Sequence, residues 1–184
     1  MMLTTDLCTK LLDAMSDVPD AATALRQVDA FRRLFAGPGT FSIQLNVTTR
    51  NDPKNEILLQ RYYSSHASNF PVKGRKHKTL TPWTKTLFVD GDIFVAEGEE
   101  ALSQTFDDYP QMRALGLNTA INVPLLKDRL CYATFNVFGK RGRWQADEIS
   151  AMRLLALTAT RWVTPIEDLS YVFDTALPAS LTTA

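Results

Sequence analysis

Neutral polar side chains recur inside two apolar stretches of the chain. Asn122 lies within residues 120–126, and Thr134 and Asn136 lie within residues 130–138. An amide buried in a strand without a hydrogen-bond partner costs about 1–3 kcal/mol. A polar small molecule could supply partners through neutral hydrogen bonds. A cross-strand network with ordered water, or simple exposure to solvent, would satisfy the same groups, so both interpretations stay open here.

The spacing of these residues predicts which way they point. The two stretches flank the polar break Lys127-Asp128-Arg129, which is typical of a β-hairpin, and Asp128 is the residue best suited to a left-handed turn. A three-residue loop at 127–129 would place Asn122 opposite Thr134 and Ala120 opposite Asn136. These four side chains would then share one face, and the alternate residues, Cys131 among them, would face the other way.

Other residues that could do chemistry are less well arranged. The basic stretch Lys73–Lys78 could hold a phosphate or a carboxylate, although such runs usually form a solvated loop or a charged edge strand. His66 and His77 are the only histidines, and no carboxylates accompany them in a pattern that indicates a metal site or a catalytic triad. Cys8 and Cys131 are far apart in sequence and are interpreted as buried free thiols.

Composition narrows the classes of function. Lys plus Arg number 20 and Asp plus Glu number 20, so the formal net charge is +0 and bulk charge does not favour nucleic acid or an acidic membrane surface. No apolar run approaches the roughly 20 residues that span a bilayer, and the first residues lack the basic and apolar regions of a signal peptide. We therefore expect a cytoplasmic protein.

The elements that position the polar residues follow from periodicity and turn signals. Residues 3–15 and the stretch before Gly37 have helical apolar spacing, whereas Phe41, Ile43 and Leu45 alternate with Ser42, Gln44 and Asn46. The predicted order is two helices in 1–36, a hairpin of 41–48 with 56–66, a helical start at 81–83, a strand at 92–96, short helices in 98–115, the second hairpin, helices in 145–173 and a flexible tail at 174–184. The last of these helices rests on the capping-box spacing of Thr164–Glu167 and would run to about Phe173.

This order predicts an α+β domain. Hairpins pair their strands into a central antiparallel β-sheet of five or six strands. The terminal helices would cover one face, and the irregular insert of helices and loops at residues 67–117 would cover a pocket on the other.

The same order resembles a GAF domain, a ligand-binding module related in shape to PAS domains. Trp83 is followed by Gly91–Val95, then Leu115–Leu117 leads into Ile121–Leu125, and Phe135–Phe138 precedes Trp144–Glu148 at the start of the last long helix. The first hairpin extends the resemblance to most of residues 1–173, which would form a single domain.

The resemblance implies more than the residues do by themselves. In this family the first and last strands are neighbours near the centre of the sheet, so Ser42, Gln44 and Asn46 would join the polar face of the second hairpin. Aromatic and apolar residues of the insert would close over the ligand. The implied ligand-binding residues are Asn122, Thr134, Asn136, Ser42, Gln44, Asn46, Trp83, Phe94, Tyr109 and Met112.

The resemblance also frames the function. A non-catalytic sensory or regulatory domain would bind an unidentified small molecule, with no metal, and would signal through a homodimer formed by the terminal helices to a separate effector protein. The alternatives are a small enzyme similar to free methionine sulfoxide reductases and a purely structural dimerisation module. Asn136, Lys140, Trp144 and Asp147-Glu148 match the signature of cyclic-nucleotide-binding members only in part.

Overall fold

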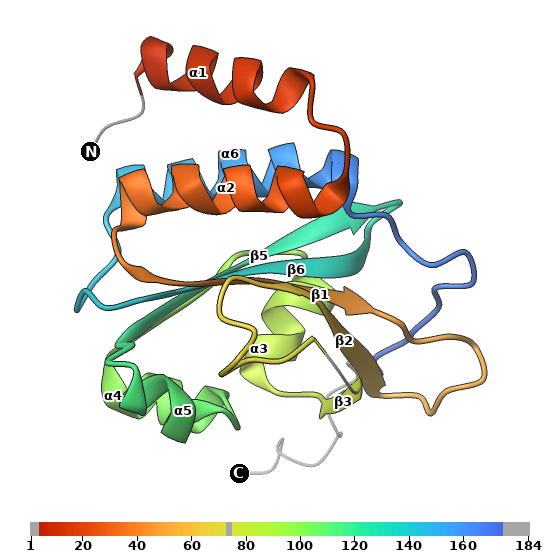
Figure 1. The fold of residues 1–184 in the computed structure, drawn as a ribbon. Helices are drawn as coiled ribbons and strands as arrows, with labels where there is room; N and C mark the ends of the chain where they lie inside the picture. The colour runs from red at the N-terminus through yellow and green to blue at the C-terminus, as the bar shows by residue number, and fades with distance from the viewer. Residues whose placement is uncertain (1–3, 73–74, 175–184) are drawn as a thin grey trace, which may run out of the picture.

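The computed structural model of the protein describes residues 4–72 and 75–174. Its centre is an antiparallel sheet of six strands in the order β3-β2-β1-β6-β5-β4 (Figure 1). The strands are β1 (Gly39–Asn46), β2 (Glu56–Ser64), β3 (Arg75–Thr79), β4 (Phe94–Glu97), β5 (Thr119–Lys127) and β6 (Leu130–Gly139). The first and last strands are therefore neighbours at the centre of the sheet, as expected, and the α+β fold class is confirmed.

The N- and C-terminal helices cover one face of the sheet. In Figure 1, α2 (Ala21–Ala36) and α6 (Ala146–Ala159) lie side by side on that face, and α1 (Thr5–Ser16) lies outside them. Asp20 begins α2 by accepting a hydrogen bond from the Thr23 amide at 2.8 Å, a standard N-cap contact. None of the helices in the two described stretches has the length and apolar character needed to cross a bilayer.

The insert lies against the opposite face of the sheet. It contains α3 (Pro82–Thr84), a π-helical turn (Lys85–Asp90), α4 (Gly98–Thr105) and α5 (Tyr109–Ala114) (Figure 1). The predicted helical start is confirmed, because Thr81 and Thr84 form a capping box around Pro82. The insert thus forms a third layer that leaves the sheet between two helical coverings.

The register of the second hairpin differs from the predicted one. The loop contains only Asp128 and Arg129, both with positive φ. A bulge shifts the register again between Leu125 and Leu126, just before the loop. The shorter loop shifts the pairing by one residue and the bulge shifts it by one more, so Asn122 lies opposite Asn136 rather than Thr134. A shift of two residues preserves which side chains share a face.

The bulge changes the side on which Cys131 lies. Tyr132 and Ala133 both contribute to the core beneath the helices, whereas Cys131 packs with Ile57 and Leu87 on the insert side. The expectation that Cys131 faces the helices is therefore wrong, because strict alternation fails at the extra residue of a bulge.

The C-terminal segment is also corrected. After α6, a 3₁₀ turn (Thr160–Trp162) ends the helical region, and residues 163–174 form no helix. Ser170 instead donates its amide to the Thr48 carbonyl, and Leu169 forms a bridge with Thr49. The predicted helix up to Phe173 is wrong because the first hairpin takes these backbone groups. The predicted tail lies, apart from Asp174, outside the described residues.

Candidate functional site

A cavity of about 270 Å³ lies between the sheet and the insert. Its floor is formed by β1, β5 and β6, and its remaining sides come from β2, β3, α3 and the link between α4 and α5. Six of the ten predicted site residues line it: Ser42, Gln44, Trp83, Met112, Asn122 and Asn136. Alternation along β1, β5 and β6 therefore brings most of the expected polar floor together, and the insert supplies part of the expected roof.

The floor is a row of polar residues across three adjacent strands. Ser42 of β1 pairs with Asn136 of β6, and Asn136 pairs with Asn122 of β5. Because residues directly opposite in antiparallel strands point to the same face, all three side chains rise toward the insert. They are buried, with Asn122 fully inaccessible to solvent.

A relay of hydrogen bonds satisfies most of this floor from within. The Trp83 indole N–H donates to Asn122 Oδ1 at 2.9 Å, and Asn122 Nδ2 donates to Asn136 Oδ1 at 2.6 Å. Asn136 Nδ2 in turn donates to Thr134 Oγ1 at 3.0 Å. The cross-strand network left open by the sequence is therefore present, and its first consequence is to fix the Trp83 ring over the floor.

Ser42 and Gln44 stand apart from this relay. Within residues 4–72 and 75–174, neither side chain makes a hydrogen bond, although both line the cavity. Ser42 is 2% exposed. A buried hydroxyl and a neighbouring amide are thus the floor groups that a bound molecule could engage without breaking an existing bond.

Four predicted site residues do not line the cavity. Thr134 lies behind Asn136 as its acceptor, and Asn46 bonds the Cys131 carbonyl at 3.2 Å and the Thr48 hydroxyl at 2.5 Å. Phe94 and Tyr109 pack in the insert's own apolar cluster around Leu102 and Met112. These two aromatic residues therefore belong to a small core within the insert, while Trp83 and Met112 also reach the cavity.

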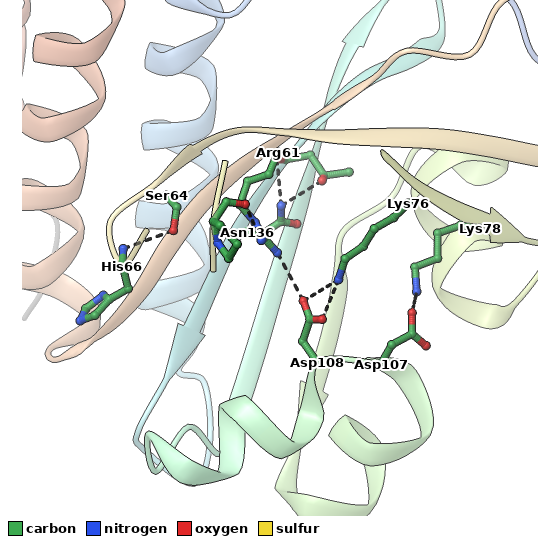
Figure 2. A network of polar contacts seen from close by, with 10 residues as sticks. Arg61, Ser64, His66, Lys76, Lys78, Asp107, Asp108 and Asn136 are labelled. Atoms are coloured by element: carbon green, nitrogen blue, oxygen red, sulfur yellow. Dashed lines mark hydrogen bonds and ion pairs between the residues drawn. The ribbon is translucent and has the colours of Figure 1, made fainter. Parts of the chain in front are cut away.

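One side of the cavity is charged, and the sequence interpretation named its lysines but missed Arg61, Asp107 and Asp108. Lys76 Nζ lies 2.7 and 2.6 Å from the two Asp108 carboxylate oxygens, and Arg61 Nη2 lies 3.3 Å from Asp108 Oδ2. Lys78 pairs with Asp107, and this hydrogen bond lowers the pKa of the Asp107 carboxyl (Figure 2). A usable signal was present, since alternate residues of a basic edge strand, here Lys76 and Lys78, point to one side.

Arg61 is the most buried of these cations. Its side chain is 10% exposed, its guanidinium lies 5.5 Å from the Phe70 ring centroid, and Nη1 donates to the Pro71 carbonyl at 3.2 Å. Its Nε is buried and has no hydrogen-bond partner in the part of the chain that the structure describes. A buried donor without an acceptor is uncommon in proteins, so this nitrogen is a candidate contact for a bound group.

Neither cysteine is placed at the cavity. Cys131 is fully buried, its thiol donates to the Ala133 carbonyl at 3.2 Å, and burial raises the pKa of this thiol. A thiol held neutral by burial is a poor nucleophile. No group of three or more His, Cys, Asp or Glu side chains that could hold a metal ion occurs among residues 4–72 and 75–174.

The partial cyclic-nucleotide signature is not gathered at one place. Asn136 lines the cavity, but Trp144 packs in the core beneath the helices. Glu148 accepts a hydrogen bond from the Gln145 amide at 3.0 Å as part of a helix cap and pairs with Arg141. Glu148 therefore has a structural role at the start of α6.

Comparison with known proteins identifies the fold. No family model and no curated protein matches the sequence. The chromophore-binding domain of a bacteriophytochrome from R. palustris is similar in structure, with a TM-score of 0.58, 12% identity, and coverage of 85% of this chain and 59% of that chain. The GAF domain of a phosphoenolpyruvate-protein phosphotransferase from Coxiella burnetii gives a TM-score of 0.59 and 12% identity, covering 85% of this chain and 90% of that chain.

A third solved structure, a cyanobacteriochrome GAF domain, gives a TM-score of 0.55 at 15% identity, covering 79% of this chain and 89% of that chain. The chain spans 59% of the bacteriophytochrome fragment, which is therefore the longer of the two. At these identities the similarity concerns the fold alone, and the chain has a GAF-like fold.

Proposed function

We propose that this GAF-like chain is a non-catalytic sensory or regulatory domain that binds a small molecule between the sheet and the insert. The observation that carries the proposal is the cavity of about 270 Å³, floored by Ser42, Gln44 and the asparagine row and roofed by Trp83. A concave site with apolar walls and a few convergent polar groups is the usual form of a small-molecule site. One of the similar structures is a chromophore-binding domain, which supports a small-molecule ligand without indicating its position.

Native mass spectrometry of the protein purified from its host tests this function. A retained small molecule is expected in the wild-type protein, and the Gln44→Leu variant should lose most of it because a floor amide without another partner is removed. Gln60→Leu is the matched control, since Gln60 is exposed on the neighbouring strand β2. Equal retention by Gln44→Leu and the wild type would exclude the floor as the site. A protein that carries no molecule and is stabilised by no compound in a thermal-shift screen would contradict the function itself.

The proposed output is a homodimer formed through the terminal helices. Leu12 of α1 and Leu157 of α6 are 66% and 69% exposed on the helical layer, which favours contact with another apolar surface. Sedimentation velocity over a range of concentrations tests this, and a monomer at every concentration would rule out signalling by dimerisation. A separate effector protein would then read the state of the dimer.

The two alternatives receive less support. A thiol enzyme similar to methionine sulfoxide reductases needs a reactive cysteine at the cavity, but the pKa of Cys131 is raised by burial and its side chain lies outside the lining. A purely structural module needs an interior filled by side chains, but the space beneath Trp83 is open.

A further inference from the structure

Ion pairs join the roof of the cavity to the edge of the sheet. The cations come from β2 and β3, namely Arg61, Lys76 and Lys78, and the carboxylates come from Asp107 and Asp108 in the link between α4 and α5. Figure 2 shows Arg61 and Lys76 converging on Asp108, with Lys78 beside Asp107. Three cations against two carboxylates leave this side of the cavity with one excess positive charge.

Asp108 contacts these cations as a bound anion would. Both of its oxygens lie within 2.7 Å of Lys76 Nζ, so the lysine contact is strong. Its contact with Arg61 is poorer, because only Nη2 reaches it, at 3.3 Å. A carboxylate or phosphate that fits a guanidinium well accepts from two of its N–H groups at once.

Arg61 therefore retains one hydrogen-bond donor that its present partners leave unsatisfied. Its Nε–H is buried and meets no acceptor among residues 4–72 and 75–174, although the residue lines the cavity. Phe70 packs against the guanidinium and excludes water from that side. An anion that takes the position of Asp108 could accept from Nε together with Nη2, whereas Asp108 reaches Nη2 alone.

We propose that the cavity selects small organic anions, and that Asp108 holds the anion position until the carboxylate or phosphate of a ligand displaces it. The apolar part of such a ligand would lie against Trp83, Met112 and Phe138, which line the rest of the cavity. The inference rests on the proposed function, since it assigns a ligand class to the same cavity.

Displacement of Asp108 would loosen the link between α4 and α5. Arg61 and Lys76 are the partners of Asp108 from the sheet. Its loss from them leaves the link held by Phe106, whose ring centroid lies 5.3 Å from that of Phe138, and by the pair of Lys78 with Asp107, whose side chain is 74% exposed. An exposed pair of this kind holds a loop only weakly. A negatively charged ligand would in this way weaken the attachment of the roof to the sheet.

Titrations followed by amide chemical shifts test the ligand class. The probes are benzoate, phenyl phosphate and the neutral isostere benzamide, each up to about 10 mM, the range in which small fragments bind. Both anions, or the one that fits, should bind the wild-type protein at least about tenfold more tightly than benzamide and should shift the amides of residues 105–109. The two anions separate a carboxylate site from a phosphate site.

Variants test the role of Asp108. Asp108→Asn keeps the shape and removes the competing charge, so the affinity for the anions should rise about tenfold while that for benzamide changes by less than about twofold. Arg61→Gln should abolish the preference for anions. Arg75→Gln, an exposed cation on the same strand as Lys76, is the matched control and should behave as the wild type.

The outcomes separate the two proposals. If benzamide shifts cavity amides as strongly as the anions do, the cavity is a ligand site and the anion inference is wrong. If Asp108→Asn weakens anion binding, Asp108 is a support rather than a competitor, and the displacement step is wrong. If none of the three probes perturbs a cavity residue in the wild type or in Asp108→Asn, the anion inference fails, whereas the small-molecule function is decided by the retained molecule and the thermal-shift screen. The wild-type comparison needs no variant to fold.

Discussion

The two faces of the sheet use alternate residues of the same strands, but they are filled in different ways. On the helix side, Phe41, Ile121 and Phe135 are completely buried in one continuous apolar cluster with α2 and α6. On the insert side, the neighbouring residues Ser42, Asn122 and Asn136 line a cavity. The helix side gains its stability by excluding water and filling space. The insert side gives up part of that gain and keeps polar groups at the surface of an enclosed volume.

The difference shows how a polar floor can exist inside a folded domain. Each buried amide needs a partner, and the relay from Trp83 through Asn122 to Asn136 supplies one without a bound molecule. The domain can therefore fold before it binds, while Ser42 and Gln44 keep their side chains available. The packed face stabilises the fold. The other face, whose asparagine amides are hydrogen-bonded around an open cavity, leaves room for a ligand.

The largest effect should come from truncating the helix side. Phe135 is fully buried and its ring centroid lies 4.6 Å from that of Phe41, so Phe135→Ala should lower the free energy of unfolding by about 3–5 kcal/mol. Phe138→Ala is the control on the same strand, because Phe138 is half-buried at the cavity. Urea denaturation measures both, and a loss for Phe138→Ala as great as for Phe135→Ala would contradict the contrast between the faces.

A smaller effect is expected from the polar floor. Asn122→Leu leaves the Trp83 indole N–H and Asn136 Oδ1 without their partner, which should cost roughly 2–4 kcal/mol. In a Trp83→Phe background one of these orphaned groups is absent, so the same substitution should cost less by roughly 0.5–3 kcal/mol. A double-mutant cycle by urea denaturation measures this coupling. Additive costs would mean that the relay does not hold the roof to the floor.

Alternation along single strands was enough to predict the two faces. Phe41, Ile43 and Leu45 separate from Ser42 and Gln44 whatever the exact register, because side chains in a strand alternate with a period of two residues. The asparagine floor was predicted for the same reason, even though the partner of Asn122 was not. Here a loop shorter by one residue and a bulge of one residue restored the parity.

Features that depend on contacts between distant segments could not be predicted in this way. Asp108 meets Lys76 across 32 residues of sequence and Arg61 across 47, and no local pattern indicates either contact. The capping-box spacing at Thr164 is a local signal that was overridden when Ser170 bonded the Thr48 carbonyl. Cys131 changed sides because a bulge, which leaves no clear mark in the sequence, interrupts the alternation.

The smallest effect expected is on the pH dependence of stability, and it distinguishes two parts of the insert side. At the end of this face next to the hairpin loop, Cys131 packs with Ile57, Leu87 and Phe88, so that part is dry and apolar while the cavity is polar. Burial raises the pKa of the Cys131 thiol in the folded protein, whereas an unfolded-state thiol ionises at about pH 8.5. The folded state keeps the thiol neutral, so the contribution to stability is complete below that pH and is lost as the pH rises above it.

The pH dependence of the free energy of unfolding therefore tests whether water is excluded from Cys131. From about pH 8 to pH 9, the free energy of unfolding of the wild-type protein should fall by roughly 0.7 kcal/mol relative to that of Cys131→Ala, because ionisation of the Cys131 thiol stabilises the unfolded state of the wild type alone. Truncating the side chain adds a constant cost, so the slope is the measurement rather than the value at one pH. Burial also raises the pKa of Tyr171, but this phenol is present in both proteins and cancels in the difference. Parallel curves for the two proteins would mean that water reaches Cys131, and the insert side would then be one continuous polar region rather than a dry support beside a binding cavity.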